Sequence, residues 1–377
     1  AQGDVVIKDN NREYYSRGLS VKIDWLLEGD AVSQDIELGL RYHQDEEDRL
    51  QRSDKYTQIN QTLVLDSIGI TGGSKNNRVV EAEALALYIK NAITFGNLIV
   101  TPGVRFEDID LERRDWSELP RNESPSLKSN QVSAVLPSIG IIYNLSDNLS
   151  LLAGAYNGFG TPTTTEGVEE EDAINLEFGG RYQQNDLLIE LIAFSSDYAN
   201  LVGECTASSS TGDCDIGDQF NGGEARVQGL EFQFVNNYPL SDMTNMPLSL
   251  AYTYTNAEFE STFDGEFFGA VAKGDPIPYI PQNQLSLTVG LEHGAYRLNA
   301  AINYVDAVCV KASCEGFEKT DASTVLDIAS HYQVNDRLGV YLKLENVTDE
   351  SDIVARQPKG ARPNKARTAT LGMRYTF

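Results

Sequence analysis

The sequence contains no run of 18 or more consecutive apolar residues, which excludes the ordinary pattern of a membrane-spanning helix. It does not begin with a basic segment followed by an apolar core, so we expect either a mature chain or one whose beginning is missing. Basic residues are also few, because 30 Lys and Arg stand against 56 Asp and Glu and give a formal net charge of −26. This acidic balance argues against a nucleic-acid partner, whose phosphates would be repelled.

Histidine is scarce, with three residues in 377, and this argues against an enzyme. His43, His293 and His331 lie on different predicted strands or turns, and the sequence holds no nucleophile elbow and no HExxH motif. His43 and the acidic residues 45–47 could bind a metal ion together, but a solvated strand end is the favoured interpretation. We therefore expect no catalytic residue, no cofactor and no metal site.

Cysteine occurs four times, as two closely spaced pairs, Cys205 with Cys214 and Cys309 with Cys314. Close pairs in predicted surface loops fit disulfides formed in an oxidising compartment. Neither spacing resembles a zinc ribbon, and metal capture is the alternative. We expect both pairs to be oxidised and to stabilise their loops by up to about 2–4 kcal/mol, less for rings this small.

The last twelve residues, 366–377, alternate between apolar and polar side chains. The apolar residues Ala369, Leu371, Met373, Tyr375 and Phe377 share one parity, so a strand here has an apolar face that runs to the last residue. A soluble sandwich strand can show the same alternation, but it rarely ends on an aromatic residue. An outer-membrane barrel strand ends this way because its last aromatic residues, here Tyr375 and Phe377, lie at the membrane interface.

Similar alternating segments recur along the chain, and in the clearest three, 285–292, 296–304 and 338–345, the charged residues keep to one parity. A Lys or Arg facing lipid near the midplane costs about 2–4 kcal/mol, whereas on the inner face it is hydrated. Short turns and long polar connections alternate between the segments, as periplasmic turns and extracellular loops do in outer-membrane barrels. The sequence therefore predicts an all-β fold, a transmembrane antiparallel β-barrel. About fifteen strands are expected, at 13–26, 33–47, 79–93, 97–111, 131–144, 149–159, 173–183, 187–203, 222–234, 247–261, 283–292, 295–307, 323–334, 337–347 and 366–377.

Two segments are assigned to connections. The segment 56–65 looks extended, but a spanning strand there would break the alternation, so it is placed in the loop 50–78; a slightly longer turn is expected at 236–246. The first and last predicted strands then both run inward, which puts the carboxyl end on the periplasmic side. Bacterial single-chain barrels have an even number of strands. We therefore expect an odd number of strands before Ala1, and residues 1–377 as the carboxyl-terminal part of one larger barrel domain.

Seven segments, in this order along the chain, resemble the TonB-dependent outer-membrane receptors, and within that family the ferric citrate receptor group. They cover the chain from near its start to its end. The segments are REYYSRGL (12–19), IELGLRYHQDEEDR (36–49), EAEALALYIKNAITFGNLIVTPGVRFEDI (81–109), CDIGDQFNGGEARVQGLEF (214–232), YIPQNQLSL (279–287), NVTDES (346–351) and GARPNKARTATLGMRYTF (360–377).

The resemblance implies a barrel of 22 strands with a plugged lumen, a size class of outer-membrane transporters. About seven strands, the plug and the TonB box would then lie before Ala1. The implied function is energised uptake of a ferric chelate, ferric citrate in particular, across the bacterial outer membrane. The implied partners are the outer-membrane lipid, the TonB system acting through the plug, the barrel assembly machinery and the chelate itself, which is cargo and not a cofactor.

Four arginines are the candidates for binding the substrate. Arg49, Arg52, Arg113 and Arg114 lie just beyond predicted strands that end outside. A ferric citrate complex is anionic, and a planar guanidinium group binds carboxylates through two hydrogen bonds. A loop salt bridge is the alternative for each arginine. The net charge of −26 opposes an anionic substrate unless the arginines dominate the local field.

Two other functions fit a barrel. A passive porin of about sixteen strands would leave an open aqueous channel. A signal peptide directly before Ala1 would favour the porin, whereas a plug and a TonB box would favour the receptor. The third class is a structural or adhesion barrel. Loops that bind a host or a polymer would favour this class.

Overall fold

The computed structural model describes residues 2–67, 77–117, 120–165, 168–204, 219–265, 268–356 and 360–377. In these ranges all regular secondary structure is β-strand. None of the described residues belongs to a helix of the length and apolar character needed to cross a membrane.

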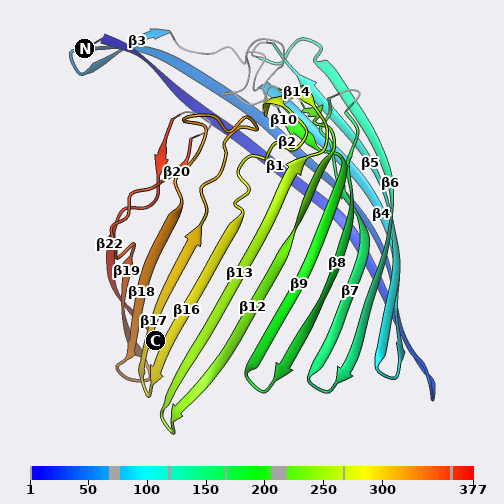
Figure 1. The fold of residues 1–377 in the computed structure, drawn as a ribbon. Helices are drawn as coiled ribbons and strands as arrows, with labels where there is room; N and C mark the ends of the chain where they lie inside the picture. Colours follow the sequence, from blue (N-terminus) through cyan, green and yellow to red (C-terminus); the bar gives the residue numbers. More distant parts are fainter. Residues whose placement is uncertain are drawn as a thin grey trace.

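The main antiparallel sheet has sixteen strands. Fifteen follow one another in chain order, each hydrogen-bonded to the next, and the sixteenth, β3 (Thr62–Ser67), pairs with β2. Every predicted strand corresponds to one of the fifteen. Figure 1 shows them side by side around a curved wall, with the loops and the amino end at one rim and the short turns at the other. The prediction of an antiparallel transmembrane barrel wall of fifteen strands is confirmed. The strands are β1 (Gln2–Glu28), β2 (Ser33–Ile59), β4 (Asn77–Phe95), β5 (Leu98–Asp115), β6 (Ser126–Ser146), β7 (Leu149–Gly160), β8 (Glu171–Gln184), β9 (Leu187–Asn200), β12 (Ala225–Ser241), β13 (Thr244–Phe259), β16 (Asn283–His293), β17 (Tyr296–Val305), β18 (Ser323–Gln333), β19 (Leu338–Glu345) and β22 (Thr368–Tyr375).

Two connections differ from the sequence-based expectation. The loop assigned to 50–78 is partly strand, because β2 continues to Ile59 and pairs with β3 (Thr62–Ser67). Asn60 and Gln61 make this turn at φ 47° and 68°, a conformation that Asn tolerates better than most residues. The longer turn expected at 236–246 is also wrong, since a bulge at Pro239 lets β12 reach Ser241 before β13 begins.

The remaining strands are short pairs within the described parts of the loops. They are β10 (Val202–Glu204) with β11 (Gln219–Asn221), β14 (Phe263–Gly265) with β15 (Gly269–Val271), and β20 (Ile353–Ala355) with β21 (Arg362–Pro363).

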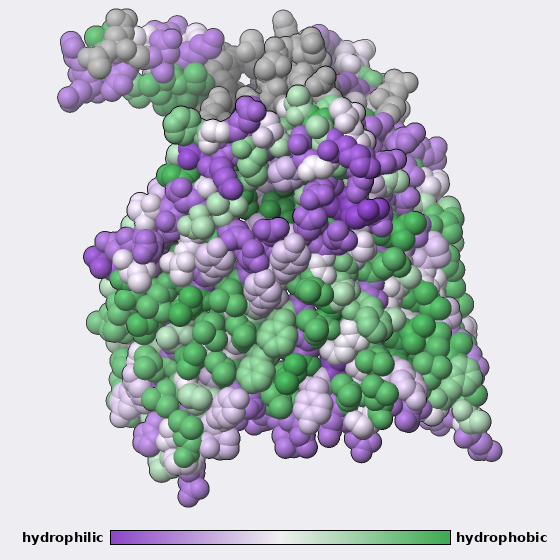
Figure 2. Space-filling view, viewed as in Figure 1, coloured by the Kyte–Doolittle hydropathy of each residue, from purple (hydrophilic) through white to green (hydrophobic). Residues whose placement is uncertain are grey.

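An apolar belt covers the outward face of the wall. Its apolar residues are direct partners across neighbouring strands. One such row consists of Val21 on β1, Leu40 on β2, Leu87 on β4 and Phe106 on β5. On the side of the wall that faces the viewer, Figure 2 shows the belt as a hydrophobic band below the hydrophilic loops. Exposed leucine and valine side chains in such a band are stable in lipid and would not be in water.

Large rings lie over glycines on the opposite face, which we call the lumen face. The Tyr88 ring covers Gly39, its direct partner on β2, and a Cβ on Gly39 would lie 2.0 Å from ring atom Cε1. The ring can lie flat there because glycine has no side chain, and its hydroxyl donates to Glu37 Oε1 at 2.7 Å. Tyr341 covers Gly372 in the same way, which ties β22 to β19.

The segment NVTDES at 346–351 forms a turn built on one buried amide. Asn346 is 2% exposed and has φ 51°. Its Nδ2 donates to the backbone oxygens of Glu350 and Lys365 at 2.8 Å each, and its Oδ1 accepts from Glu350 N at 3.0 Å. Because every polar atom of this buried side chain is satisfied, the turn fixes how the chain returns toward β22.

Candidate functional site

A row of three arginines crosses the lumen face beside the loops. Arg12 on β1 is the direct partner of Arg49 on β2, which is the direct partner of Arg78 on β4. Each arginine is nine residues from an outward-facing belt residue of its own strand, and this odd spacing puts it on the lumen face. We call Arg12, Arg49 and Arg78 the arginine row.

Positive charge is concentrated in the row. Like charges directly opposite on neighbouring strands are destabilising. Burial, and then the charges of Arg12 and Arg78, lower the pKa of Arg49 from its usual range, yet a guanidinium group stays protonated at neutral pH. Arg49 Nε is buried and has no hydrogen-bond partner among the residues that the structure describes. Arg12 Nη1 lies 3.3 Å from Glu47 Oε1, which offsets part of the charge at one end.

Two more cations lie beside the row on the same face. Arg113 on β5 is the direct partner of Lys128 on β6. On its other side it pairs with Val80 on β4, and Val80 lies two residues after Arg78 on the same face. Arg113 is 5% exposed, and its Nε lies 2.8 Å from Asp115 Oδ2. The wall at this end of the lumen thus carries five cationic side chains on five adjacent strands.

The structure separates the four arginines predicted from the sequence. Arg49 and Arg113 face the lumen, whereas Arg114 is on the outward face and is paired there with Glu81. Arg52 lies in β2 opposite Asp9, and its side chain is outside the described parts of the structure. Sequence reasoning missed Arg12 and Arg78, which lie one residue before the predicted strands 13–26 and 79–93. The register that aligns them with Arg49 is the signal that would have found them.

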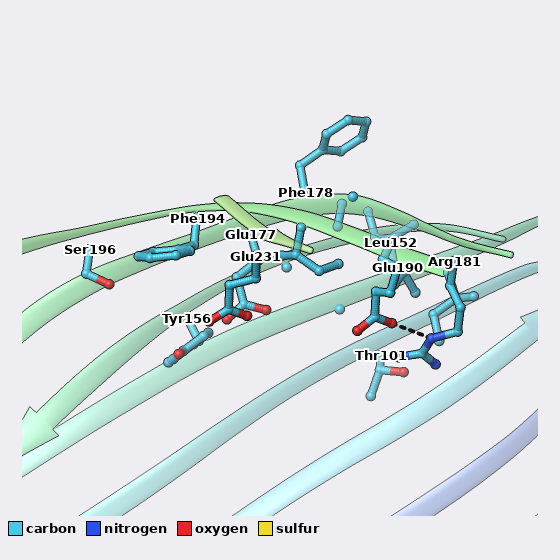
Figure 3. Close-up of a pocket in the computed structure, with 17 residues that line it drawn as sticks. Thr101, Leu152, Tyr156, Glu177, Phe178, Arg181, Glu190, Phe194, Ser196 and Glu231 are labelled. Atoms are coloured by element: carbon cyan, nitrogen blue, oxygen red, sulfur yellow. Dashed lines mark hydrogen bonds and ion pairs between the residues drawn. The ribbon is translucent and has the colours of Figure 1, made fainter. Parts of the chain in front are cut away.

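A pocket of opposite charge lies further along the lumen face. It has a volume of about 610 Å³, and its floor includes Gly140, Gly154 and Gly179 on β6, β7 and β8, where the wall has no side chains. Figure 3 shows Glu177, Glu231 and Tyr156 pointing toward one another, beside the ion pair of Arg181 with Glu190. Three carboxylates against one guanidinium favour a cationic group in this pocket.

The loops around the mouth are hydrogen-bonded to one another. Gln219 joins two of them, because its Oε1 accepts from Thr163 N at 2.5 Å and its N donates to Thr165 Oγ1 at 3.1 Å. Further links connect loops to one another or to the ends of strands, since Asp48 lies on β2 and Asn130 on β6. They are Arg121 to Asp48, Asn130 to Thr163, Phe268 to Ala312 and Ile353 to Asp321.

One cysteine pair and an aromatic cluster hold the loops above β13 and β17. Cys309 and Cys314 form a disulfide with a Cα–Cα distance of 5.0 Å. Ala312 within this ring is 1% exposed and packs in a cluster with Phe259 and Phe268. The other pair, Cys205 with Cys214, lies outside the described residues.

The remaining predicted residues have simple surroundings. His43 Nε2 lies 3.4 Å from Asp45 Oδ2. The described part of the chain holds no group of three or more His, Cys, Asp or Glu residues arranged to hold a metal ion. The exposed rings of Tyr375 and Phe377 make an edge-to-face contact, with centroids 5.2 Å apart.

Residues 3–347 match the family model "TonB dependent receptor-like, beta-barrel". The chain belongs to the TonB-dependent receptor family. Members of this family are bacterial outer-membrane β-barrel proteins, so the apolar belt faces the lipid of the outer membrane and the arginine row lies near the extracellular end of a receptor barrel.

Solved receptor structures share this fold. The ferric citrate transporter FecA, unliganded, is 22% identical with a TM-score of 0.73, covering 98% of this chain and 55% of FecA. The siderophore receptor PiuA from Acinetobacter baumannii is 16% identical (TM-score 0.73; coverage 98% and 56%), and the ferric-catecholate import receptor Fiu from E. coli K12 is 15% identical (TM-score 0.74; coverage 98% and 55%). The chain thus spans a little over half the length of these receptors.

Proposed function

We propose that the receptor containing this barrel takes up an anionic ferric chelate, ferric citrate, across the outer membrane with energy from the TonB system. The arginine row is the observation that carries the proposal. Carboxylates and guanidinium groups form charge-assisted, bidentate hydrogen bonds. Arg49 Nε, buried and without a partner among the described residues, is a donor that a bound carboxylate would satisfy. The structural likeness to FecA, a ferric citrate transporter, supports the same ligand.

The arginine row also explains how a protein with a large negative net charge could bind an anionic ligand. The net charge is −26, but surface charges more than about 10 Å apart are largely screened in salt. Within the row, three guanidinium groups are direct cross-strand neighbours, and Arg113 and Lys128 continue the same face. Glu47 and Asp115 offset part of this charge, and we propose that the five cations still outweigh the carboxylates beside them.

The proposal includes a plug and further strands outside residues 1–377. β1 has 27 residues and β22 has eight, so pairing β1 with β22 alone would leave much of the β1 edge unpaired, including part of the segment that crosses the lipid. Strands of matching length between them would satisfy that edge. The acidic pocket around Glu177 and Glu231 suits cationic side chains of a plug.

Transport would then proceed in three steps. The arginine row and the plug capture the chelate, the loops close over it, and the TonB system moves the plug so that the chelate passes. The iron chelate is cargo throughout. The outward-facing Tyr375 and Phe377 are the proposed contact for the barrel assembly machinery.

Binding of ferric citrate to the full-length receptor tests the ligand. Arg49→Ala and Arg78→Ala should each weaken binding about tenfold or more, since a hydrogen bond to a charged group contributes about 1.5–3 kcal/mol. Arg114→Ala is the matched control, because Arg114 is a neighbour in sequence but faces outward. Isothermal titration in detergent gives the affinities, and equal affinities for all three variants and the wild type would exclude the row.

Uptake by cells tests the transport class. Iron uptake from ferric citrate should stop in cells that lack TonB. Uptake that continues there would support the passive porin instead.

A further inference from the structure

A loop arginine lies directly behind the arginine row. Arg121, in the connection between β5 and β6, uses all three guanidinium nitrogens. Its Nη2 and Nη1 donate to Asp48 Oδ1 and Oδ2 at 2.6 and 2.9 Å, and its Nε donates to Asn77 Oδ1 at 2.8 Å. Its central carbon lies 4.5 Å from the centroid of the Trp116 ring. Arg121 is therefore fixed in one geometry by two strands and an aromatic face.

The two residues that Arg121 binds are next to the row in sequence. Asp48 precedes Arg49 on β2, and Asn77 precedes Arg78 on β4. Because neighbouring residues of a strand point to opposite faces, Asp48 and Asn77 lie on the outward face, behind Arg49 and Arg78. Asn77 is 2% exposed, and its backbone oxygen also accepts from Trp116 N at 2.9 Å.

The link joins two strands that carry like charges opposite each other. Arg49 and Arg78 are direct partners across β2 and β4, and like charges in that position push the strands apart. Arg121 joins the same two strands from the other face with a bidentate ion pair and an amide hydrogen bond. Arg121 thus adds a second connection between β2 and β4 at the end of their ladder, where Arg49 and Arg78 form the second-last pair.

We propose that Arg121 is a positioning residue for ligand binding: it holds Arg49 and Arg78 at the separation that one anion can bridge. The identity of that anion rests on the proposed function. The role of Arg121 rests on its contacts with Asp48 and Asn77.

The test compares Arg121→Gln with Arg226→Gln in the full-length receptor. Arg226 is a suitable control, since it also pairs with two carboxylates, Asp197 and Glu260, but is on β12, away from the row. Arg121→Gln should weaken ferric citrate binding about tenfold, and Arg226→Gln should leave it unchanged. Amide hydrogen exchange at 47–50 and 77–80 should become faster in Arg121→Gln only.

A charge reversal separates positioning from general loss of structure. Asp48→Arg combined with Arg121→Asp restores the ion pair with its ends exchanged, so it should recover most of the binding that Arg121→Gln loses. The same recovery is expected of exchange at 47–50 and 77–80.

The outcomes distinguish the two proposals. If Arg49→Ala weakens binding and Arg121→Gln does not, the positioning role is overturned and the proposed function stands. If Arg49→Ala has no effect, the proposed function fails and hydrogen exchange decides the positioning role. Unchanged exchange in Arg121→Gln overturns that role, and faster exchange at both segments supports it.

Discussion

The face on which a side chain lies decides what it can do in this molecule. Arg113 and Arg114 are consecutive, yet one faces the lumen and the other pairs with Glu81 on the outward face. The sequence pattern was sufficient to pick Arg49 as a candidate. It could not align Arg49 with Arg12 and Arg78, because cross-strand register depends on turn lengths and bulges that lie far from these residues.

The glycine under the Tyr88 ring, Gly39, should tolerate no larger side chain. Gly39→Ala would place a Cβ 2.0 Å from the Tyr88 ring, so the ring must move and its hydrogen bond to Glu37 is lost. We expect the free energy of unfolding to fall by about 1–3 kcal/mol. Urea unfolding of the receptor in lipid vesicles measures it. Gly140→Ala is the control, since its nearest heavy atom would lie 3.9 Å away, and an equal loss in both variants would contradict the role of Tyr88.

Among the elements, the membrane-spanning strands were predictable and the structure of the loops was not. Alternation and loop length identified fifteen of the sixteen strands of the sheet, all except β3, because a strand facing lipid on one side must alternate. The extension of β2 to Ile59 and the pairing of β3 lie beyond the lipid, where no such constraint applies. The loops are also held by contacts between distant segments, such as Gln219 with Thr163 and Thr165, which local sequence does not reveal.

The disulfide ring should protect its loop from proteolysis. Cys309→Ser opens a ring whose closure stabilises the loop by about 2 kcal/mol, and it frees Ala312 from the cluster with Phe268. Cleavage by trypsin after Lys311 should become about tenfold faster or more. Cleavage after Arg121, in a distant loop, should keep its rate. Equal rates after Lys311 in wild type and variant would show that the aromatic cluster alone holds the loop.

The same loop should loosen in acid. The Ser313 hydroxyl donates to Glu318 Oε2 at 2.5 Å and lowers the pKa of that carboxyl below its ordinary 4.5. A lowered pKa means that the carboxylate stabilises the loop at higher pH, and that this contribution is lost as the pH falls through the lowered value. Reduction of the Cys309–Cys314 bond by a phosphine should therefore be slow from pH 7 to about 4.5 and faster below. In Glu318→Gln the disulfide should be reduced quickly at every pH. If the reduction rate of the wild-type disulfide does not rise below about pH 4.5, the role of Glu318 is refuted.

For the whole molecule, lipid on one side and water on the other determine the architecture. The belt followed from the sequence because burying a charge in lipid is costly at every strand, and the direction of the chain followed from the alternation of short turns and long loops. The way in which the wall closes could not be derived, since β1 and β22 are the end strands of the sheet and differ in length by nineteen residues.

Two neighbouring substitutions test the assignment of faces. Leu298 on β17 faces outward and Asn299 faces the lumen. Leu298→Arg should lower the stability of the folded barrel by up to about 2–4 kcal/mol, the cost of a lipid-facing arginine at the bilayer midplane, whereas Asn299→Arg should have little effect because its charge is hydrated. The amount of heat-modifiable, folded receptor in outer-membrane fractions shows the difference. Similar amounts of both variants would mean that β17 does not present Leu298 to lipid.

The hydrogen bonds between loops also affect how the cell surface is recognised. Thr163 has partners in another loop, through Gln219, and on β6, through Asn130, so the shape of its loop depends on neighbouring segments. A synthetic peptide copied from one loop lacks those neighbours. Antibodies raised against such a peptide should bind the denatured receptor and miss intact cells, whereas antibodies raised against the folded barrel should recognise epitopes composed of several loops.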